Sequence, residues 1–356
     1  MLYISIEIVM NELDIYLYGI PIVLSLIVAE VAYSTINNLG YYKLKDSLAG
    51  LGLLFGNVVI SLLTKGSIFF FSLYLYQYKL ITINELLPTW SVWVLTFIMI
   101  DFVYYWYHRC SHRIRFLWAV HMNHHSSEEM NFTVALRQPW FGSLTKVPFF
   151  AVMPLIGFDP VITAIAGSVS TLYGLLTHTK WVNKLGALEY ILVTPSHHRV
   201  HHGSNEIYID KNYGNLLIIW DKIFGTYAEE NEEVTYGIRE NVKTFNPIKI
   251  TFMLWYSMYK DFKKTKVFKN KLLSFFGTPE WIRKSAEVLN HPADRIVFLL
   301  PGTFHEPGTS WKNPYSPKVD MISIPSTDLS DGWKQSEFLF EIPLETVGFM
   351  IMADGD

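Results

Sequence analysis

The sequence predicts an all-α integral membrane protein with about four membrane helices or helical hairpins and a histidine-rich helical cap on the cytosolic side. Three observations support this fold class. Half of the 356 residues are hydrophobic and 16% are aromatic. Several apolar runs reach the length of about 20 residues that a helix needs to cross a bilayer. Ten of the twelve histidines lie between residues 108 and 202, close to the ends of such runs.

Three apolar regions are long enough to span a membrane. Residues 15–36 form the first span. Residues 47–78 are too long for one upright helix, so they predict either a long tilted helix or a helix broken near Gly66. Residues 90–108 form the third span, with Trp and Tyr at both ends, as is typical of a membrane interface. The glycines of "GLGLLFG" at 50–56 lack the spacing of a dinucleotide-binding loop and predict close helix packing instead.

A fourth apolar region, residues 147–177, contains the turn signal "GFDP" at 157–160. Its two halves are short, so the region predicts a helical hairpin or a re-entrant pair. Basic residues set the orientation of membrane helices. Because no Lys or Arg precedes Lys43, we expect the N-terminus outside and the histidines on the cytosolic face. The expected location is a bacterial inner membrane or the endoplasmic reticulum.

The chain is expected to contain four parts. Membrane helices occupy residues 1–89, and a histidine-rich catalytic domain occupies residues 90–230. Residues 231–280 include "YKDFKKTKVFKNK", which predicts either an amphipathic helix on an anionic membrane leaflet or a solvated helix face. Residues 281–356 contain short apolar runs among prolines and acids, and predict an irregular or β-containing appendage. The net charge of −3 gives no indication of nucleic-acid binding.

The histidines occur at helical ligand spacing. Residues three or four apart on an α-helix share a face, so each group should direct its imidazoles to one point. Buried imidazoles without a metal would lack hydrogen-bond partners or repel one another when protonated. The sequence therefore predicts a metal site, with these candidate ligands: His108 and His112; His121, His124 and His125; His178; His197 or His198; His201 and His202.

The number of imidazoles predicts two metal ions. Eight to ten side chains exceed the four to six that one ion can use. Neutral imidazole suits iron, zinc, copper and nickel, and the sequence alone does not choose between iron and zinc. The single cysteine, Cys110, cannot build a zinc site of the cysteine type, and we expect it to pack on the far side of its helix.

Two acids lie inside the predicted spans. Asp101 is two helical turns before His108, so we expect it to accept the distal N–H of a ligand histidine, or to pair with Arg109 or Arg113. Glu30 could act in the same way from the first helix. No haem, flavin or nucleotide motif is visible, so any electrons for redox chemistry must come from outside the chain.

The order HxxxH at 108–112, HxxHH at 121–125 and HxxHH at 198–202 resembles the fatty acid hydroxylase/sterol desaturase superfamily over roughly residues 90–230. Within it, "HHSSEEMNFTVALRQ" and "IDKNYGNLLIIWDKIFGTY" are similar to the alkylglycerol monooxygenase branch. The resemblance implies two iron ions, with zinc able to replace them in isolated protein, and O2 as co-substrate. The implied reductant is external: tetrahydrobiopterin in that branch, a small redox protein elsewhere.

The resemblance also carries residues over. His178 matches a histidine of the branch. Separately, the candidate catalytic residues are Asp101, Asn123, Tyr213 and Asp221. The chain departs from the branch at Arg113, where the branch has an acid.

The expected activity is O2-dependent hydroxylation of a long-chain lipid, with an ether lipid such as an alkylglycerol favoured. The alternatives are a fatty acyl or sterol hydroxylase or desaturase with a protein electron donor, a metal transporter, and a metal-stabilised membrane scaffold. Transport sites lie near the bilayer midplane, whereas these histidines flank the ends of the spans.

Overall fold

The structure, a computed structural model, describes residues 2–239 and 241–279 and, beyond them, strand residues 295–301, 322–323, 327–328 and 334–341. The chain divides into two compact units, Met1–Pro279 and Glu280–Asp356. The described residues of the first unit form helices and loops. Those of the second form an antiparallel sheet in the order β1-β4-β2, with β3 also on β4: β1 (Arg295–Pro301), β2 (Ile322–Ser323), β3 (Thr327–Asp328) and β4 (Lys334–Glu341).

Within the described residues, three helices are long and apolar enough to cross a membrane: α1 (Leu2–Ile36, apolar over Leu17–Ile36), α2 (Leu44–Tyr76) and α4 (Thr89–Arg113). They correspond to the three predicted spans. The α2 helix continues through Gly66 without a break, so the long-helix interpretation is the correct one. The mean hydropathy is 1.8 for α1 and α2 but 1.2 for α4, because α4 carries the polar residues that face the interior.

The fourth apolar region is a pair of shorter segments joined by a turn. The first segment contains α6 (Gly142–Phe150) and α7 (Val152–Ile156), and the second is α8 (Pro160–Leu176). Asp159 caps α8 by accepting hydrogen bonds from Val161 N at 2.8 Å and Ile162 N at 3.2 Å. Gly157 has φ +126°, and a Cβ there would lie 2.0 Å from the Ile81 carbonyl oxygen, so only glycine fits this turn.

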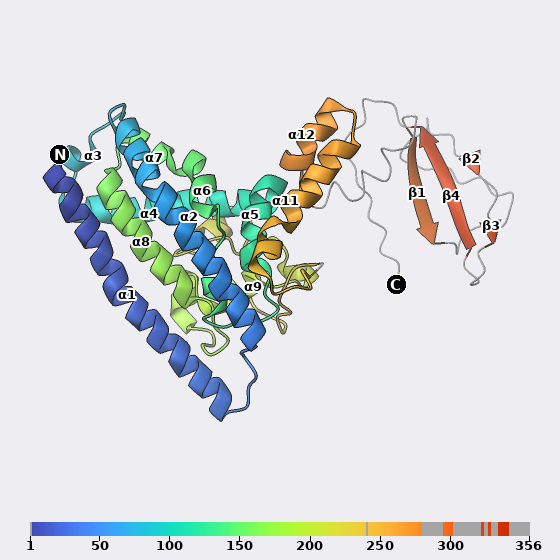
Figure 1. The fold of residues 1–356 in the computed structure, drawn as a ribbon, viewed down its shortest axis with the longest axis horizontal. Helices are drawn as coiled ribbons and strands as arrows, with labels where there is room; N and C mark the ends of the chain where they lie inside the picture. Colours follow the sequence, from blue (N-terminus) through green and yellow to red (C-terminus); the bar gives the residue numbers. More distant parts are fainter. Residues whose placement is uncertain are drawn as a thin grey trace. The chain divides into compact units, whose positions relative to one another are not determined.

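The helix α4 lies at the centre of the helical unit. It packs against α8, α5 (Arg115–His125) and α6, while α1 packs on α8 and α2 on α6, as Figure 1 shows. A buried apolar cluster that includes Val92, Ile100 and Met153 joins α4 to the hairpin. Gly52 of α2 faces Pro247, the first residue of α11 (Pro247–Lys264), so closely that a Cβ would lie 2.8 Å from the proline ring, which confirms the predicted close helix packing. The outward faces of α1 and α2 are apolar, as expected for helices that contact lipid.

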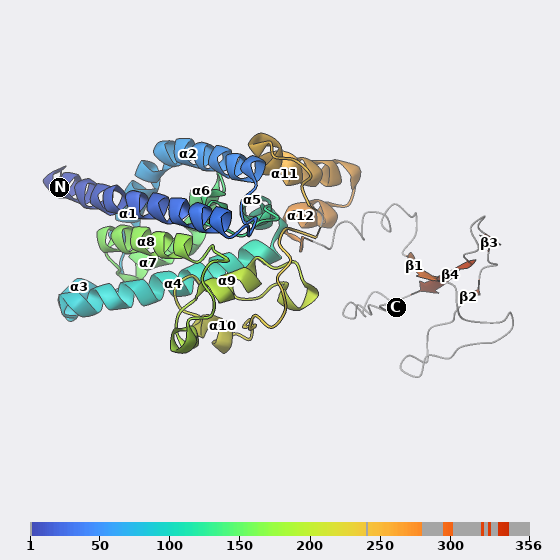
Figure 2. The same cartoon turned by 90° about the horizontal axis from the view of Figure 1, so that it is seen from below.

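Short helices and loops cover one end of this bundle. They are η1 (Val134–Leu136), η2 (Gly186–Tyr190), α9 (Pro195–His201), η3 (Glu206–Tyr208), α10 (Ile219–Ile223), α11 (Pro247–Lys264) and α12 (Phe268–Phe276). The short helix α3 (Ile83–Leu86) lies instead at the other end of α4 (Figure 2). Only Ile114, in an extended conformation, separates α4 from α5. In Figure 2, α9 and α10 lie beside the C-terminal half of α4. The histidine motifs of α4, α5 and α9 therefore meet at one end of the bundle.

Candidate metal centre

Nine histidines form two clusters. In each cluster the candidate ligand nitrogens all lie within 4.8 Å of one another. The five-histidine cluster contains His108, His112, His121, His125 and His201, and the four-histidine cluster contains His124, His178, His198 and His202. Eight of the nine side chains are buried, and His112 is partly exposed.

The helix geometry divides each HxxHH motif between the two clusters. We expected the three histidines of a motif to point to one place, and this expectation was wrong. His121 and His125, four residues apart, share the five-histidine cluster, whereas His124 belongs to the other. Residues at i+3 and i+4 lie about 100° apart around a helix, so one turn can serve two sites. The α9 motif reverses the pattern, because His198 and His202 share the four-histidine cluster and His201 joins the five-histidine cluster.

The four-histidine cluster has the outline of a square. Successive Nε2 atoms around the ring 124–178–198–202 are 3.1, 2.9, 3.1 and 3.1 Å apart. Neighbouring ring centroids are 4.1–4.9 Å apart, and the two diagonals are longer, at 5.1 and 6.3 Å. The centre of such a square lies about 2.1 Å from each nitrogen, which matches a metal–imidazole bond. A tetrahedral site would require nitrogen separations of about 3.4 Å for the same bond length.

In the five-histidine cluster, His108, His121, His125 and His201 form a similar ring of four, and His112 is the fifth side chain. The Nε2 atoms of His121 are 2.9 Å from His108 and 3.1 Å from His125, which in turn is 3.1 Å from His201. The rings of His201 and His108 close the circle with centroids 4.3 Å apart. The His112 ring is nearly equidistant from all four, at 4.7–5.3 Å. His112 therefore occupies an apical place over the other four.

Backbone carbonyls fix the tautomers of three of these imidazoles. The Nδ1 atoms of His108, His178 and His201 lie 2.8 Å from Tyr213 O, 2.9 Å from Gly174 O and 3.0 Å from Lys211 O. A carbonyl oxygen only accepts hydrogen bonds, so the proton of each ring is on Nδ1 and the Nε2 atom presents a lone pair to the cluster. Lone pairs converging at about 3 Å repel one another unless a cation lies between them.

Burial keeps the clustered imidazoles neutral. It lowers the pKa of His178 to about 3 and that of His201 to about 4, against the effect of their backbone hydrogen bonds. Burial, and then the neighbouring histidines, also lower the pKa of His121, His125 and His202 well below the usual value. Neutral imidazole is the form that binds a metal, so the site needs no proton release at neutral pH.

The predicted role of Asp101 is wrong. Its buried carboxylate contacts no histidine and accepts hydrogen bonds from Leu216 N, Leu217 N and Trp220 Nε1 at 2.8, 2.9 and 3.0 Å. It pairs with neither Arg109 nor Arg113, whose contacts are Tyr105 and Asp210. A carboxylate in an apolar helix needs donors, and the 216–220 loop supplies three.

Asp221 supports the same loop closer to the histidines. Its carboxylate accepts from Tyr213 N at 2.7 Å, Gly214 N at 2.8 Å and Thr226 Oγ1 at 2.7 Å. Tyr213 then accepts from His108 through its carbonyl, and its ring lies 5.2 Å from the His112 ring. Asp221 and the Tyr213 backbone thus orient His108, and neither carboxylate enters a cluster.

Asn123 and Glu30 lie away from the clusters. The Asn123 side chain points to α11, where its amide is 3.4 Å from Thr251 Oγ1, although it sits between ligand-bearing turns of α5. Glu30 accepts from Phe132 N at 2.9 Å and from the hydroxyls of Tyr42 and Thr179. The expected contact of Glu30 with a ligand histidine is therefore wrong, although through Thr179 it anchors the residue next to His178.

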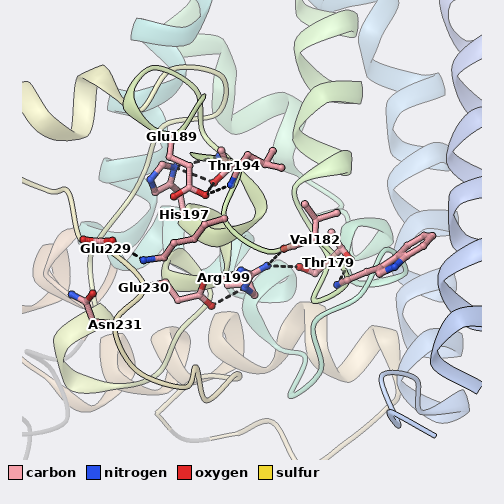
Figure 3. A network of polar contacts seen from close by, with 12 residues as sticks. Thr179, Val182, Glu189, Thr194, His197, Arg199, Glu229, Glu230 and Asn231 are labelled. Atoms are coloured by element: carbon pink, nitrogen blue, oxygen red, sulfur yellow. Dashed lines mark hydrogen bonds and ion pairs between the residues drawn. The ribbon is translucent and has the colours of Figure 1, made fainter. Parts of the chain in front are cut away.

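An arginine that the sequence analysis did not single out joins the two segments of the four-histidine cluster. Arg199 is buried on α9 and donates to Thr179 O at 2.9 Å, to Val182 O at 2.7 Å and to both carboxylate oxygens of Glu230 at 2.7 Å (Figure 3). It holds the loop after His178 against the helix that carries His198. Its position inside "HHRVHH" could have identified it in the sequence, because a buried cation among metal ligands needs hydrogen-bond acceptors or an acid of its own.

His197 lies in neither cluster. Its Nδ1 accepts from the Thr194 backbone N–H at 3.3 Å, so His197 closes a capping box at the start of α9 (Figure 3). The Thr194 hydroxyl donates to Glu189 at 3.1 Å on the same side. The prediction of His197 as a metal ligand is therefore wrong, and His198 leads the last motif. Cys110, partly exposed, is also outside both clusters.

The part of the chain that carries the histidines is similar to known proteins. Residues 93–226 match the model of the fatty acid hydroxylase family, a range that contains all nine clustered histidines. The chain is 43% identical over 221 residues to human alkylglycerol monooxygenase, covering 60% of this chain and 49% of that protein. It is 42% identical over 205 residues to the alkylglycerol monooxygenase of Xenopus tropicalis, covering 58% and 45%.

A more distant relative is an ornithine lipid hydroxylase of Rhizobium tropici, 32% identical over 135 residues, covering 38% of this chain and 41% of that protein. The chain spans about half the length of the alkylglycerol monooxygenases that it matches. No solved structure matches the chain significantly.

Proposed function

Because residues 93–226 match the model of the fatty acid hydroxylase family, we propose that this chain is a membrane-bound, di-iron, O2-dependent monooxygenase that hydroxylates a long-chain lipid. The observation that carries the proposal is the convergence of uncharged Nε2 lone pairs in two buried clusters. Among lipid substrates we favour an ether lipid such as an alkylglycerol, because the relatives at 41–43% identity are alkylglycerol monooxygenases.

The nine clustered histidines would hold two ions, one in each cluster. Neutral imidazole suits iron, and the match of residues 93–226 to the fatty acid hydroxylase family favours iron as the ion. Bound iron would supply the activation of O2 that oxidation of an unactivated C–H bond requires. The chain keeps the imidazoles neutral through burial and orients His108, His178 and His201 through backbone carbonyls.

The substrate class follows from the surroundings of the clusters. α1, α2 and α4 are apolar, and the clusters lie at one end of the helix bundle. A lipid whose chain lies among these helices would gain about 0.8 kcal/mol for each CH₂ group that it buries. We propose that the helices and the α6–α8 hairpin are embedded in the membrane. We also propose that the clusters face the cytosol, since Arg109 and Arg113 lie at the end of α4 that carries the histidines.

The chain offers no redox cofactor motif, so we propose an external reductant. Arg113, where the relatives' branch is expected to have an acid, donates to Asp210 at 2.8 Å and remains more than half exposed. Its charge is therefore partly neutralised within the chain, and tetrahydrobiopterin, the reductant that the resemblance implies, is the one we favour.

The assay combines purified iron-loaded protein with an alkylglycerol, O2 and either tetrahydrobiopterin or a protein electron donor. Aldehyde release with the pterin is the expected result. Turnover of a fatty acyl or sterol lipid only with the protein donor would instead favour the alternative hydroxylase. The absence of ¹⁸O incorporation into any membrane lipid with either donor would contradict the monooxygenase proposal, provided that iron loading is verified by metal analysis.

A further inference from the structure

The helix α11 presents an apolar face that nothing in the described chain covers. Ile248, Phe252, Tyr256 and Tyr259 are 41–60% exposed and follow one another at helical spacing. The opposite face of α11 is buried against the bundle. An open groove of about 440 Å³ runs along the first part of this stripe, lined by Ile248, Phe252 and Tyr256 together with Met253 and Lys249. α12 continues the pattern with exposed Phe268 and Leu272.

The charges on this helical hairpin are almost all positive. Residues 247–279 contain seven lysines and one acid. The acid, Asp261, is already paired with the buried Arg115 at 2.7 Å. Lys260 and Lys263 lie over the rings of Tyr256 and Tyr259, with Nζ 4.3 and 5.6 Å from the ring centres. The lysines thus flank the apolar stripe with charges that no acid of the hairpin neutralises.

The hairpin packs against the first turns of α2, a helix long and apolar enough to cross a membrane. Gly52 of α2 is so close to Pro247 that a Cβ would lie 2.8 Å from the proline ring, and Ala49 and Leu53 pack with Ile250. These are the first turns of an apolar spanning helix whose outer side chains, such as Leu48 and Phe55, are 56% and 72% exposed. The exposed stripe of α11 therefore continues the lipid-facing surface of α2 at one membrane boundary.

Aromatic side chains mark the same boundary. The Phe252 ring lies 5.9 Å from Trp140 and 6.1 Å from Phe141, and Phe116 lies 5.0 Å from Trp255. Aromatic residues concentrate where the hydrocarbon region meets water. An amphipathic helix with aromatic and lysine residues, placed at this depth, has the features of a helix that lies in the plane of the interface.

We propose that α11 and α12 form an interfacial surface that binds anionic phospholipid of the same membrane that α2 crosses. Phe252 and Tyr256 enter the region of the acyl chains, and the lysine ammonium groups contact the phosphate or carboxylate of the headgroup. A second copy of the chain fits less well, because two surfaces with seven lysines each would repel. The proposal is independent of the reaction that the histidine clusters support.

The test measures which lipid lies next to the hairpin. In a Cys110→Ala background, Tyr256→Cys is labelled with a fluorophore and the full chain is placed in bilayers. Nitroxide-labelled phosphatidylserine or phosphatidylcholine is then added at equal content. The serine lipid should quench the label more strongly. The preference for the serine lipid over the choline lipid, measured as the ratio of their apparent affinities at the label, should fall about fivefold for each lysine removed in Lys260→Gln and Lys263→Gln. The control Lys184→Gln, an exposed lysine outside the hairpin, should leave it unchanged.

A label on Glu206→Cys, an exposed site of η3, provides the position control and should be quenched by neither lipid. Equal quenching of the Tyr256 label by both lipids would overturn the preference for anionic lipid. No quenching by either would overturn the whole proposal. Cross-linking between labelled chains would then identify a second copy as the occupant. Metal content of each variant, checked in parallel, shows that the helical unit is folded.

Discussion

The two histidine clusters both take ligands from α5 and α9 but are supported differently. α5 gives two ligands to the five-histidine cluster and one to the four-histidine cluster, and α9 does the reverse. The five-histidine cluster depends on the 211–217 loop, whose carbonyls orient His108 and His201. The four-histidine cluster depends on the loop after α8, held by Arg199. Each site should therefore be separable from the other by substitution outside the ligands.

The largest expected effect comes from removing one ligand, and neighbouring residues provide a matched pair. His124→Ala leaves three imidazoles in its cluster, whereas His125→Ala leaves four in the other. Both variants should lose activity by more than 100-fold, because even residues behind metal ligands are worth about 10–100-fold. Metal analysis should give about one ion per chain for His124→Ala and a value closer to two for His125→Ala.

The outcome that counts against this division is an equal loss of metal in both variants, which would mean that the nine histidines act as one site. Full activity of His124→Ala with normal metal content would contradict the metal centre itself. Circular dichroism of each variant distinguishes loss of metal from loss of the helical fold.

Asp221→Ala should weaken the five-histidine cluster alone. The change leaves the backbone N–H groups of Tyr213 and Gly214 without acceptors, at about 1–3 kcal/mol for each buried group. The Tyr213 carbonyl then holds His108 less firmly. We expect metal affinity at that cluster to fall about 10–100-fold, measured by competition with a chelator. A similar fall at the four-histidine cluster would show that the loop supports the fold in general rather than one site.

Asp101→Asn should mainly lower stability. Its donors, at Leu216, Leu217 and Trp220, lie farther along the loop than Tyr213. Asparagine keeps one acceptor oxygen but places an NH₂ group against a donor, which should cost about 1–3 kcal/mol. Thermal unfolding in detergent should shift down by several degrees while both ions are retained. Loss of one ion from Asp101→Asn at unchanged unfolding temperature would contradict this interpretation.

The sequence correctly predicted which side chains share a face of one helix. It did not predict contacts that depend on how two elements pack against each other. Spacing along a helix showed that His108 with His112, and His198 with His202, share a face. His124 and His125 point in different directions because successive residues of a helix are about 100° apart. The cluster that each one joins depends on the position of α9, which the sequence does not give. Asp101 was assigned to His108 because both share a face of α4, although its true partners are more than a hundred residues later in the chain.

The sequence also did not reveal that the loop carrying Lys211 and Tyr213 orients ligand histidines, for a related reason. Backbone carbonyls have no sequence signature, and only the local pattern hinted at a special conformation. Asp210 and Asn212 have φ values of +61° and +53°, a region that Asp and Asn tolerate better than most residues. The run "IDKNYGN" could have indicated a fixed, left-handed turn, but its contact with the histidines required the tertiary structure.

The smallest effect is expected at His197, and it tests the boundary of both clusters. His197 stands beside a ligand in sequence, but it accepts a hydrogen bond from the Thr194 N–H and caps α9 instead. His197→Gln keeps an acceptor that can reach that N–H, whereas His197→Ala does not, so the alanine variant alone should lose about 0.5–2 kcal/mol of stability. Metal analysis should give the unsubstituted value for both variants. A lower metal content in His197→Gln, with unfolding unchanged, would place His197 among the ligands after all and leave the four-histidine cluster incomplete as drawn. If only the alanine variant changes, and only in its unfolding temperature, the four histidines of "PSHHRVHH" have two roles. His198, His201 and His202 are then ligands, and His197 is a helix cap.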